Sequence, residues 1–323
     1  MSALLDLAML AAGIALLIGG GEGLVRGASG LARQLGVSPL AIGLTVVAFG
    51  TSAPELAVNV LAAMRGDTGV SFGNVVGSNI ANVGLILGCA ALVRPLEVQS
   101  AVIVREMPMM LVASAAALVL GLDRASGRTE VYDRGDGMAL LLFFSIFLYY
   151  TIAEVLRGRR TDPLVHESKS ATSGPGATAP SGLLAVAGLV GLALGAEGTV
   201  RGAVSLAETL GVPRAIVGLT LVAVGTSLPE LVTSVVAARR GQVDLAVGNV
   251  VGSNIFNLLF VLGVTSTIRP VAIPAGGVVD LSAMAVFSAA LLFLAATHGN
   301  RLVRWEGGVL LFAYLAYVVA RVV

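Results

Sequence analysis

Two short motifs place an acidic residue and a proline inside strongly apolar sequence. In GTSAPE the carboxylate belongs to Glu55, which follows Pro54 directly and lies three and four residues after Ser52 and Thr51. A proline inside a helix donates no hydrogen bond to the preceding turn, so the motif predicts a break or kink that frees carbonyl oxygens. A second copy, GTSLPE, holds the equivalent residues Thr226, Ser227, Pro229 and Glu230.

Each motif supplies ligands that are all oxygen atoms. At spacings of three and four residues, Thr51, Ser52 and Glu55 are expected to share one helical face. Hard cations such as Ca²⁺ and Na⁺ prefer oxygen ligands, whereas softer metals prefer nitrogen or sulfur. The chain has two histidines, one cysteine and no HExxH or CxxC motif, which argues against a zinc site.

A second duplicated motif, GNVVGSNIAN at residues 73–82 and GNVVGSNIFN at 248–257, adds neutral oxygens. Asn74, Ser78 and Asn82 lie four residues apart, on one face of a predicted helix. Their counterparts in the second copy are Asn249, Ser253 and Asn257. A Gly, Ser and Asn face on its own is more typical of helix packing than of ligation. The occurrence of both motifs twice favours a cation site.

The composition indicates that these motifs lie in a membrane. The chain is 56% hydrophobic and 12% charged, whereas soluble domains are about 25% charged. Its mean hydropathy is +0.93. The net charge of +1 leaves no basic surplus for nucleic acid, and the first apolar stretch is interpreted as a membrane span, not a removed signal peptide.

The sequence predicts an all-α membrane protein with ten transmembrane helices, of which the second and seventh are broken. Each candidate has the roughly 20 mainly apolar residues that a span needs. They lie near residues 4–32, 38–64, 70–92, 100–121, 137–156, 182–207, 213–238, 245–267, 276–297 and 303–322. We expect a first five-helix repeat at 1–156, a flexible cytoplasmic linker at 157–180 and a second five-helix repeat at 181–323.

The repeat is visible in the sequence itself. An offset of 175 residues aligns positions 20–88 with 195–263 without a gap, and 39 of these 69 positions are identical. A unit with an odd number of helices places its second copy in the opposite orientation, a plan typical of secondary transporters. Placing the amino terminus outside leaves 12 of the 20 Lys and Arg residues in inner loops. Glu22 with Arg26 and Glu197 with Arg201 are predicted to form structural ion pairs.

The duplicated motifs resemble the two alpha repeats of the calcium/cation antiporter superfamily, which includes the sodium/calcium exchangers and their bacterial relatives. The resemblance covers residues 43–82 and 218–257, and the ten-helix layout extends it to nearly the whole chain. It implies that Glu55 and Glu230 are the central calcium-binding acids and that the carbonyls of Thr51 and Thr226 help to hold calcium. The flanking sodium sites and central asparagine positions that it implies are Ala48, Ser52, Ser78, Ala223, Ser227, Ser253, Asn82 and Asn257.

The resemblance also indicates what this chain lacks. In potassium-dependent relatives an Asp occupies the position of Asn257, so asparagine here implies independence of potassium. The predicted linker is too short for the large regulatory calcium-binding domains of animal exchangers.

The sequence therefore predicts an antiporter that exchanges Ca²⁺ for Na⁺ across the plasma or inner membrane by alternating access. It is not expected to be an enzyme or to need a cofactor or an obligatory protein partner. A Ca²⁺/H⁺ antiporter and a passive cation channel are the alternatives. An intramembrane protease lacks support, because no GxGD motif or serine-based catalytic pair occurs at membrane depth.

Overall fold

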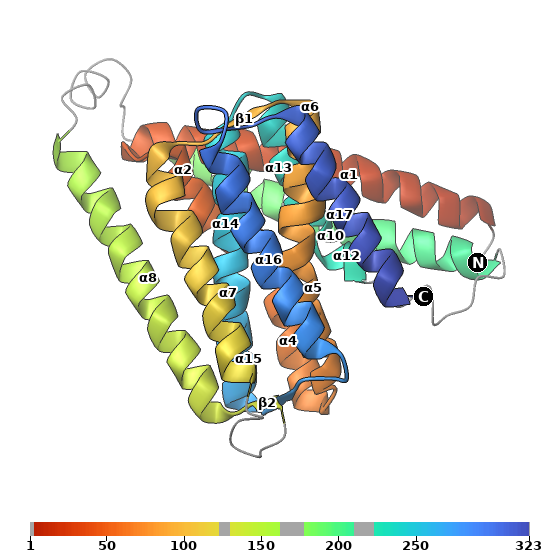
Figure 1. Ribbon diagram of the computed structural model, residues 1–323. Helices are drawn as coiled ribbons and strands as arrows, with labels where there is room; N and C mark the ends of the chain where they lie inside the picture. Colours follow the sequence, from red (N-terminus) through yellow and green to blue (C-terminus); the bar gives the residue numbers. More distant parts are fainter. Residues whose placement is uncertain (1–2, 123–129, 162–177, 210–222, 323) are drawn as a thin grey trace.

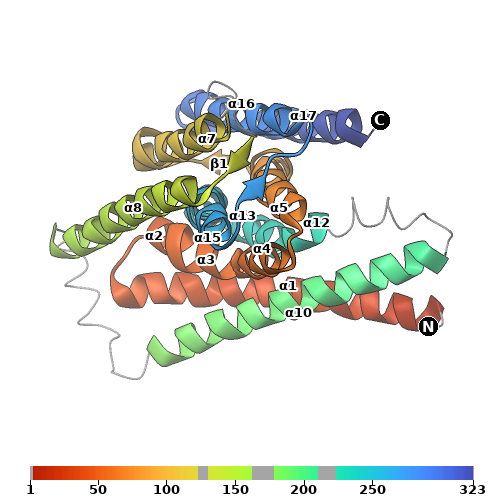
Figure 2. The ribbon, with the colours of Figure 1, turned by 90° about the horizontal axis from the view of Figure 1, so that it is seen from below.

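The computed structural model describes residues 3–122, 130–161, 178–209 and 223–322. Nearly all of these residues are helical, as the apolar segments predicted. The helices form a bundle that two long helices cross along one side (Figures 1 and 2).

These two long helices are α1 (Ala3–Leu35) and α10 (Thr178–Thr209). They lie side by side in Figure 2, with glycines at seven-residue intervals along the line where they meet. A Cβ atom on Gly20 of α1 would lie 2.6 Å from the backbone nitrogen of Leu192, and one on Gly195 of α10 would lie 2.6 Å from that of Leu17. The two backbones are therefore close enough that only glycine fits at these positions.

The predicted break in the second span is present. This span consists of α2 (Pro39–Ile42), the π-helical turn η1 (Gly43–Val47), α3 (Ala48–Thr51) and α4 (Ala53–Arg65). Its two halves bend by 42° at Ser52, and Pro54 lies in the first turn of α4. Proline is well tolerated there, because the first amide groups of a helix have no partner within it.

The second copy of this span breaks at the same position of its motif. Helix α12 (Ala223–Thr226) ends before Ser227, and α13 (Leu228–Arg239) begins after it. Ser227 has φ −90° and ψ 3°, nearly the same as the −87° and 4° of Ser52. The first part of this predicted span, residues 213–222, lies outside the described residues.

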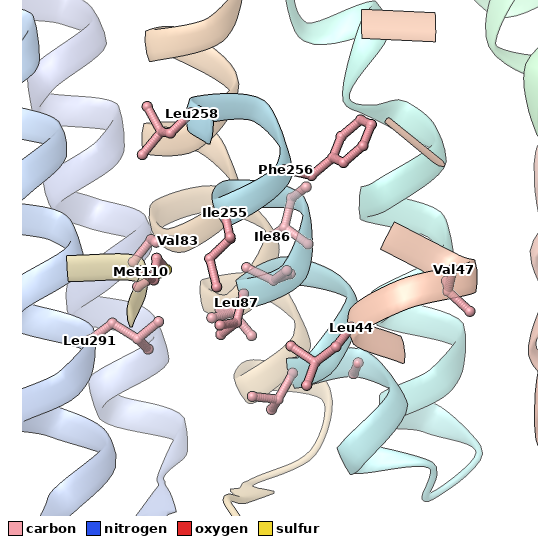
Figure 3. Packing of buried hydrophobic residues seen from close by; sticks show 14 of the residues in the cluster. Leu44, Val47, Val83, Ile86, Leu87, Met110, Ile255, Phe256, Leu258 and Leu291 are labelled. Carbon is pink, nitrogen blue, oxygen red and sulfur yellow. The ribbon is translucent and has the colours of Figure 1, made fainter. Parts of the chain in front are cut away.

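Two spans run through the centre of the bundle. One consists of α5 (Thr68–Ala81), η2 (Asn82–Leu87) and α6 (Gly88–Val93), and the other of α14 (Val243–Ile255), η6 (Phe256–Val261) and α15 (Leu262–Ile268). Figure 3 shows aliphatic side chains of both spans in one buried cluster, among them Val83, Ile86 and Leu87 from the first span and Ile255 and Leu258 from the second. Because this core is apolar and dense, the polar residues on the same helices are shielded from lipid.

The remaining helices flank the centre. They are η3 (Val102–Glu106) with α7 (Met107–Gly121), α8 (Arg134–Thr161), α16 (Gly277–Ala296) and α17 (Arg304–Val322). Helix α8 continues to Thr161 and α10 begins at Thr178, so the helices extend into both ends of the predicted linker. Its centre lies outside the described residues.

Two short strand pairs reveal the orientation of the central spans. Strand β1 (Leu96–Glu97) follows α6 and pairs with β4 (Arg301–Leu302), whereas β2 (Val131–Tyr132) pairs with β3 (Val271–Ala272), which follows α15. Figure 1 shows β1 and β2 at opposite ends of the bundle. The two central spans, which are copies of each other, therefore end on opposite sides.

Seven helices of the described part are long and apolar enough to cross a membrane, or eight if the bent pair Pro39–Thr51 and Ala53–Arg65 counts as one span. The predicted spans near 213–238 and 303–322 are not among them, although α17 occupies the second range. The count of ten stays a prediction.

Candidate functional site

The two acidic residues occupy equivalent, buried positions. Glu55 lies in the first turn of α4 and Glu230 in the first turn of α13, and each side chain is 1% exposed. The unpaired amide groups at a helix start carry partial positive charge, which favours a carboxylate there. Each break therefore creates a place where an acid can be buried at membrane depth.

Direct hydrogen bonds join the two motifs. The Ser52 hydroxyl donates to Oε1 of Glu230 at 3.0 Å, and the Ser227 hydroxyl donates to the Ser78 hydroxyl at 3.2 Å. All four side chains are buried. Residues that are far apart in the sequence, and that belong to different repeats, thus form one site.

The spacing suggested a different role for the hydroxyls. The predicted helical face of Thr51, Ser52 and Glu55 is interrupted, because α3 ends at Thr51 and α4 starts at Ala53, with a 42° bend between them. The hydroxyls of both residues instead contact the other repeat: Ser52 bonds Glu230, and Thr51 donates to Oδ1 of Asn249 at 3.1 Å.

Two asparagines, Asn74 and Asn249, each form a hydrogen bond with one of the threonines, a contact that the sequence did not indicate. Asn249 accepts from Thr51, and Asn74 donates to Thr226 Oγ1 at 3.2 Å, which is the equivalent contact in the other repeat. Asn74 in turn accepts from Asn59 at 2.7 Å, and the equivalent contact runs from Asn249 to Ser234 at 3.0 Å. Thr51 and Thr226 are therefore each held by an asparagine that is itself hydrogen-bonded to a further polar side chain.

The amides thus hold each broken span at the residue where its first helical segment ends, Thr51 in α3 and Thr226 in α12. The sequence did carry a signal, since Asn74 and Asn249 stand at the repeat offset; it did not reveal what they contact.

Several buried oxygens of the site have no hydrogen-bond partner among the described residues. An unpaired buried polar atom costs free energy, and an unpaired buried carboxylate costs much more. A bound cation would supply the missing partner. The atoms are both carboxylate oxygens of Glu55, Oε2 of Glu230, Oγ of Ser253, Oδ1 of Asn82 and Oδ1 of Asn257.

The other predicted ligands are placed around this cluster. Ser253 is fully buried in α14, and Asn82 and Asn257 are 1% exposed at the π-helical turns η2 and η6. Helix α13 packs against η2, and α4 packs against η6, so each asparagine turn meets the helix that carries the acid of the other repeat. Ala48 is buried in α3. Ala223 begins α12, and its side chain lies outside the described part of the structure.

A cavity of about 1240 Å³ reaches the site from the α10 side. Its walls include Thr51 and Pro54 from one broken span and Thr226 and Pro229 from the other. Most of the remaining lining is aliphatic or aromatic, and Glu197 of α10 is its acidic member. The cavity thus connects the broken segments with the surface along α10.

The two predicted Glu–Arg pairs are confirmed. Glu22 lies 3.4 Å from Arg26, and Glu197 lies 2.6 Å from Arg201. Glu22 makes a second ion pair that the sequence did not indicate, with Arg240 at the end of α13.

The fold and the site define a multi-pass membrane protein with two buried acids at the centre of a duplicated helical bundle. The sequence profile of the sodium/calcium exchanger protein family matches residues 5–153 and 181–323. The chain belongs to this family, which confirms the resemblance found in the motifs.

Individual relatives cover most of the chain. It is 34% identical to the sodium/calcium exchanger MaX1 of Methanosarcina acetivorans over 88% of this chain and 89% of that protein. It is 35% identical to the inner membrane protein YrbG of Escherichia coli over 83% of this chain and 81% of that protein. A solved structure of the sodium-calcium exchanger NCX_Mj, soaked with Na⁺ and Sr²⁺, superposes with a TM-score of 0.85 at 31% identity, covering 98% of this chain and 99% of that one.

Proposed function

We propose that this protein is a secondary antiporter that exchanges Ca²⁺ for Na⁺ across the cell membrane. The observation that carries the proposal is the pair of buried acids, of whose four carboxylate oxygens only Oε1 of Glu230 has a hydrogen-bond partner in the described part. Family membership supports the same class of activity, as does the structural similarity to NCX_Mj.

Charge neutralisation accounts for exchange at such a site. Two glutamates match the charge of one Ca²⁺, and two or more Na⁺ at overlapping positions could replace it. When the empty site changes its access from one side to the other, two negative charges stay in a medium of low dielectric constant, which is unfavourable. With either Ca²⁺ or Na⁺ bound, the site is close to neutral and can change its access more easily. Ions that share ligands cannot bind at the same time. Because only the ion-bound site changes its access, the movement of one ion across the membrane is coupled to the return of the other.

Neutral oxygens in the site support Na⁺ as the proposed coupling ion. Ser52 bonds Glu230, Ser227 bonds Ser78, and Ser253 is buried in α14, so these helices carry four additional buried hydroxyls. A Na⁺ ion can use such oxygens as ligands, while a proton needs only a carboxylate. We therefore favour sodium over proton coupling.

The proposal includes the ten-span layout of two inverted five-helix repeats, with the amino terminus outside. The two central spans end on opposite sides of the bundle, which supports inversion of the repeats. A repeat unit must cross the membrane an odd number of times for its second copy to be inverted. We place the protein in the plasma or inner membrane, in keeping with the name of its relative YrbG.

The test is Ca²⁺ uptake into proteoliposomes, with Na⁺ and H⁺ gradients imposed separately at clamped voltage. Wild-type protein is expected to take up Ca²⁺ in response to an outward Na⁺ gradient. Glu55→Gln and Glu230→Gln are expected to lose Ca²⁺ flux while still inserting, since each removes half of the opposing charge. Glu97→Gln is the matched control, because that side chain is 70% exposed and pairs with Arg301 away from the site.

Two results would contradict the proposal at different levels. Near wild-type flux in either site variant would show that the acid is not a cation ligand. Flux that follows the pH gradient and ignores Na⁺ would keep the site but replace sodium by protons, as in a Ca²⁺/H⁺ antiporter.

A further inference from the structure

A second pair of asparagines lies behind the proposed cation ligands. Asn79 and Asn254 are separated by the repeat offset, and both are 1% exposed. Asn254 Oδ1 accepts a hydrogen bond from Nδ2 of Asn82 at 2.9 Å. Its own Nδ2 donates to the backbone oxygen of Asn79 at 3.3 Å and lies 3.4 Å from the sulfur of Met110. Asn254 is therefore held at both ends of its amide.

This contact determines which end of the Asn82 amide is available. An asparagine amide carries an acceptor oxygen at one end and an NH₂ donor at the other, and only the oxygen can bind a cation. Because the Asn82 NH₂ group is engaged by Asn254, its orientation is fixed. Oδ1 of Asn82 remains buried, without a partner among the described residues.

The free oxygen belongs to the part of the helix that meets the site. Asn82 follows Ser78 by four residues, and Ser78 accepts the hydrogen bond of Ser227. The turn η2, which begins at Asn82, packs against α13, the helix of Glu230.

The same contact is not made in the other repeat. Its members would be Asn257 and Asn79, at the same offset from Asn82 and Asn254. Both polar atoms of the Asn257 side chain, and Oδ1 of Asn79, lack partners in the described part of the chain. Asn79 Nδ2 instead donates to the backbone oxygen of Val75 at 2.7 Å. One of the two repeat-related amides is thus oriented, and the other is not.

We propose that Asn254 is a positioning residue, which presents the Asn82 amide oxygen to the transported cation by holding its NH₂ group on the opposite side. Asn79 is the equivalent residue for Asn257, and this contact is open in the present structure. The inference rests on the proposed function, because it assumes that Asn82 is a ligand of the cation bound by Glu55 and Glu230.

The experiment measures equilibrium Ca²⁺ binding and the KM and kcat of Ca²⁺ uptake for Asn254→Leu, which removes the acceptor at similar size. Loss of residues that orient metal ligands typically weakens metal affinity by about 10–100-fold. We expect the Kd and KM for Ca²⁺ to rise roughly tenfold, with a smaller effect on kcat. Asn254→Ala provides the same test if the leucine variant does not fold. Ser288→Ala is the control, since it breaks a buried hydrogen bond to Ser114 in the flanking helices.

A second background separates positioning from general support of the fold. In Asn82→Asp both side-chain oxygens can bind a cation, so the orientation of this side chain no longer needs to be set. Adding Asn254→Leu to Asn82→Asp should then change the Ca²⁺ Kd by less than about twofold, far below the roughly tenfold effect expected in the wild-type background. A purely structural role would give the same loss in both backgrounds and would overturn the inference.

The outcomes also separate this inference from the proposed function. If Glu55→Gln binds Ca²⁺ as well as the wild type, the proposed site itself is wrong, and the inference is lost with it. If Glu55→Gln loses binding while Asn254→Leu and Asn254→Ala bind normally, the site stands and only the positioning role is refuted.

Discussion

The glycine contacts between α1 and α10 allow a matched prediction at two neighbouring residues. A Cβ on Gly20 would lie 2.6 Å from the backbone nitrogen of Leu192 and 2.8 Å from the backbone oxygen of Gly188, whereas a Cβ on Gly19 would meet no atom within 4 Å. To restore ordinary contact at about 3.4 Å, the helices at Gly20→Ala would have to separate locally by roughly 0.8 Å.

The difference between Gly20→Ala and Gly19→Ala isolates the effect of this close approach. Replacing glycine by alanine inside a helix is favourable by roughly 1 kcal/mol, and both variants share this gain. Overpacking typically costs about 1–3 kcal/mol and applies only at Gly20. We expect Gly19→Ala to be as stable as the wild type or slightly more stable, and Gly20→Ala to be less stable than Gly19→Ala by about 1–3 kcal/mol.

Thermal unfolding of the purified protein, followed by size-exclusion chromatography after heating, measures this difference. The apparent Tm of Gly20→Ala should lie several degrees below that of Gly19→Ala. Gly195→Ala should behave like Gly20→Ala, because a Cβ there would lie 2.6 Å from the backbone nitrogen of Leu17. If all three variants melted together, the backbones of α1 and α10 would not be in the close contact described.

Two further predictions concern the ions. Ser52→Ala with Ser227→Ala should weaken the Na⁺ dependence of exchange more than it weakens Ca²⁺ binding, which isothermal titration and gradient-driven flux measure separately; equal losses would contradict a sodium role for these hydroxyls. Ca²⁺ exchange should proceed without K⁺, because Asn257 carries no charge, and an absolute requirement for K⁺ in proteoliposomes would refute this.

The sequence was sufficient to locate the broken helices and their acids. A proline beside a glutamate in an apolar segment has few stable solutions, because the freed backbone groups and the charge both need protection from lipid. The structure accordingly breaks at Ser52 and Ser227 and buries Glu55 and Glu230 in the turns that follow.

The partners of these residues could not be predicted in the same way. Spacing along one helix indicates which side chains share a face, but it does not indicate which surface that face meets. The hydrogen bonds from Ser52 to Glu230 and from Asn82 to Asn254 depend on how the repeats pack together. The two-residue strands were also missed, because an alternating pattern needs about four residues to be recognised.

The two repeats are alike in sequence but differ in the contacts of α1 and α10. Glu22 of α1 pairs with Arg240 at the end of α13, and α1 packs against that helix. At the same offset, Glu197 of α10 pairs with Arg201 of its own helix, and Arg65 at the end of α4 forms no ion pair within the described residues. The cavity that reaches the site lies on this side, between α10 and the start of α4.

Alternating access, as proposed, requires two states of similar free energy that open to opposite sides. We expect such states because Glu22 and Arg240, which join α1 to the end of α13, have counterparts at the repeat offset in Glu197 and Arg65. Closing α10 onto α4 would bring Glu197 towards Arg65, and the opposite movement of α1 away from α13 would separate Glu22 from Arg240. The ion pair formed on one side would replace the ion pair lost on the other. The two states would then differ little in free energy from these contacts, so the cation bound between the acids would have the larger effect on the change of access.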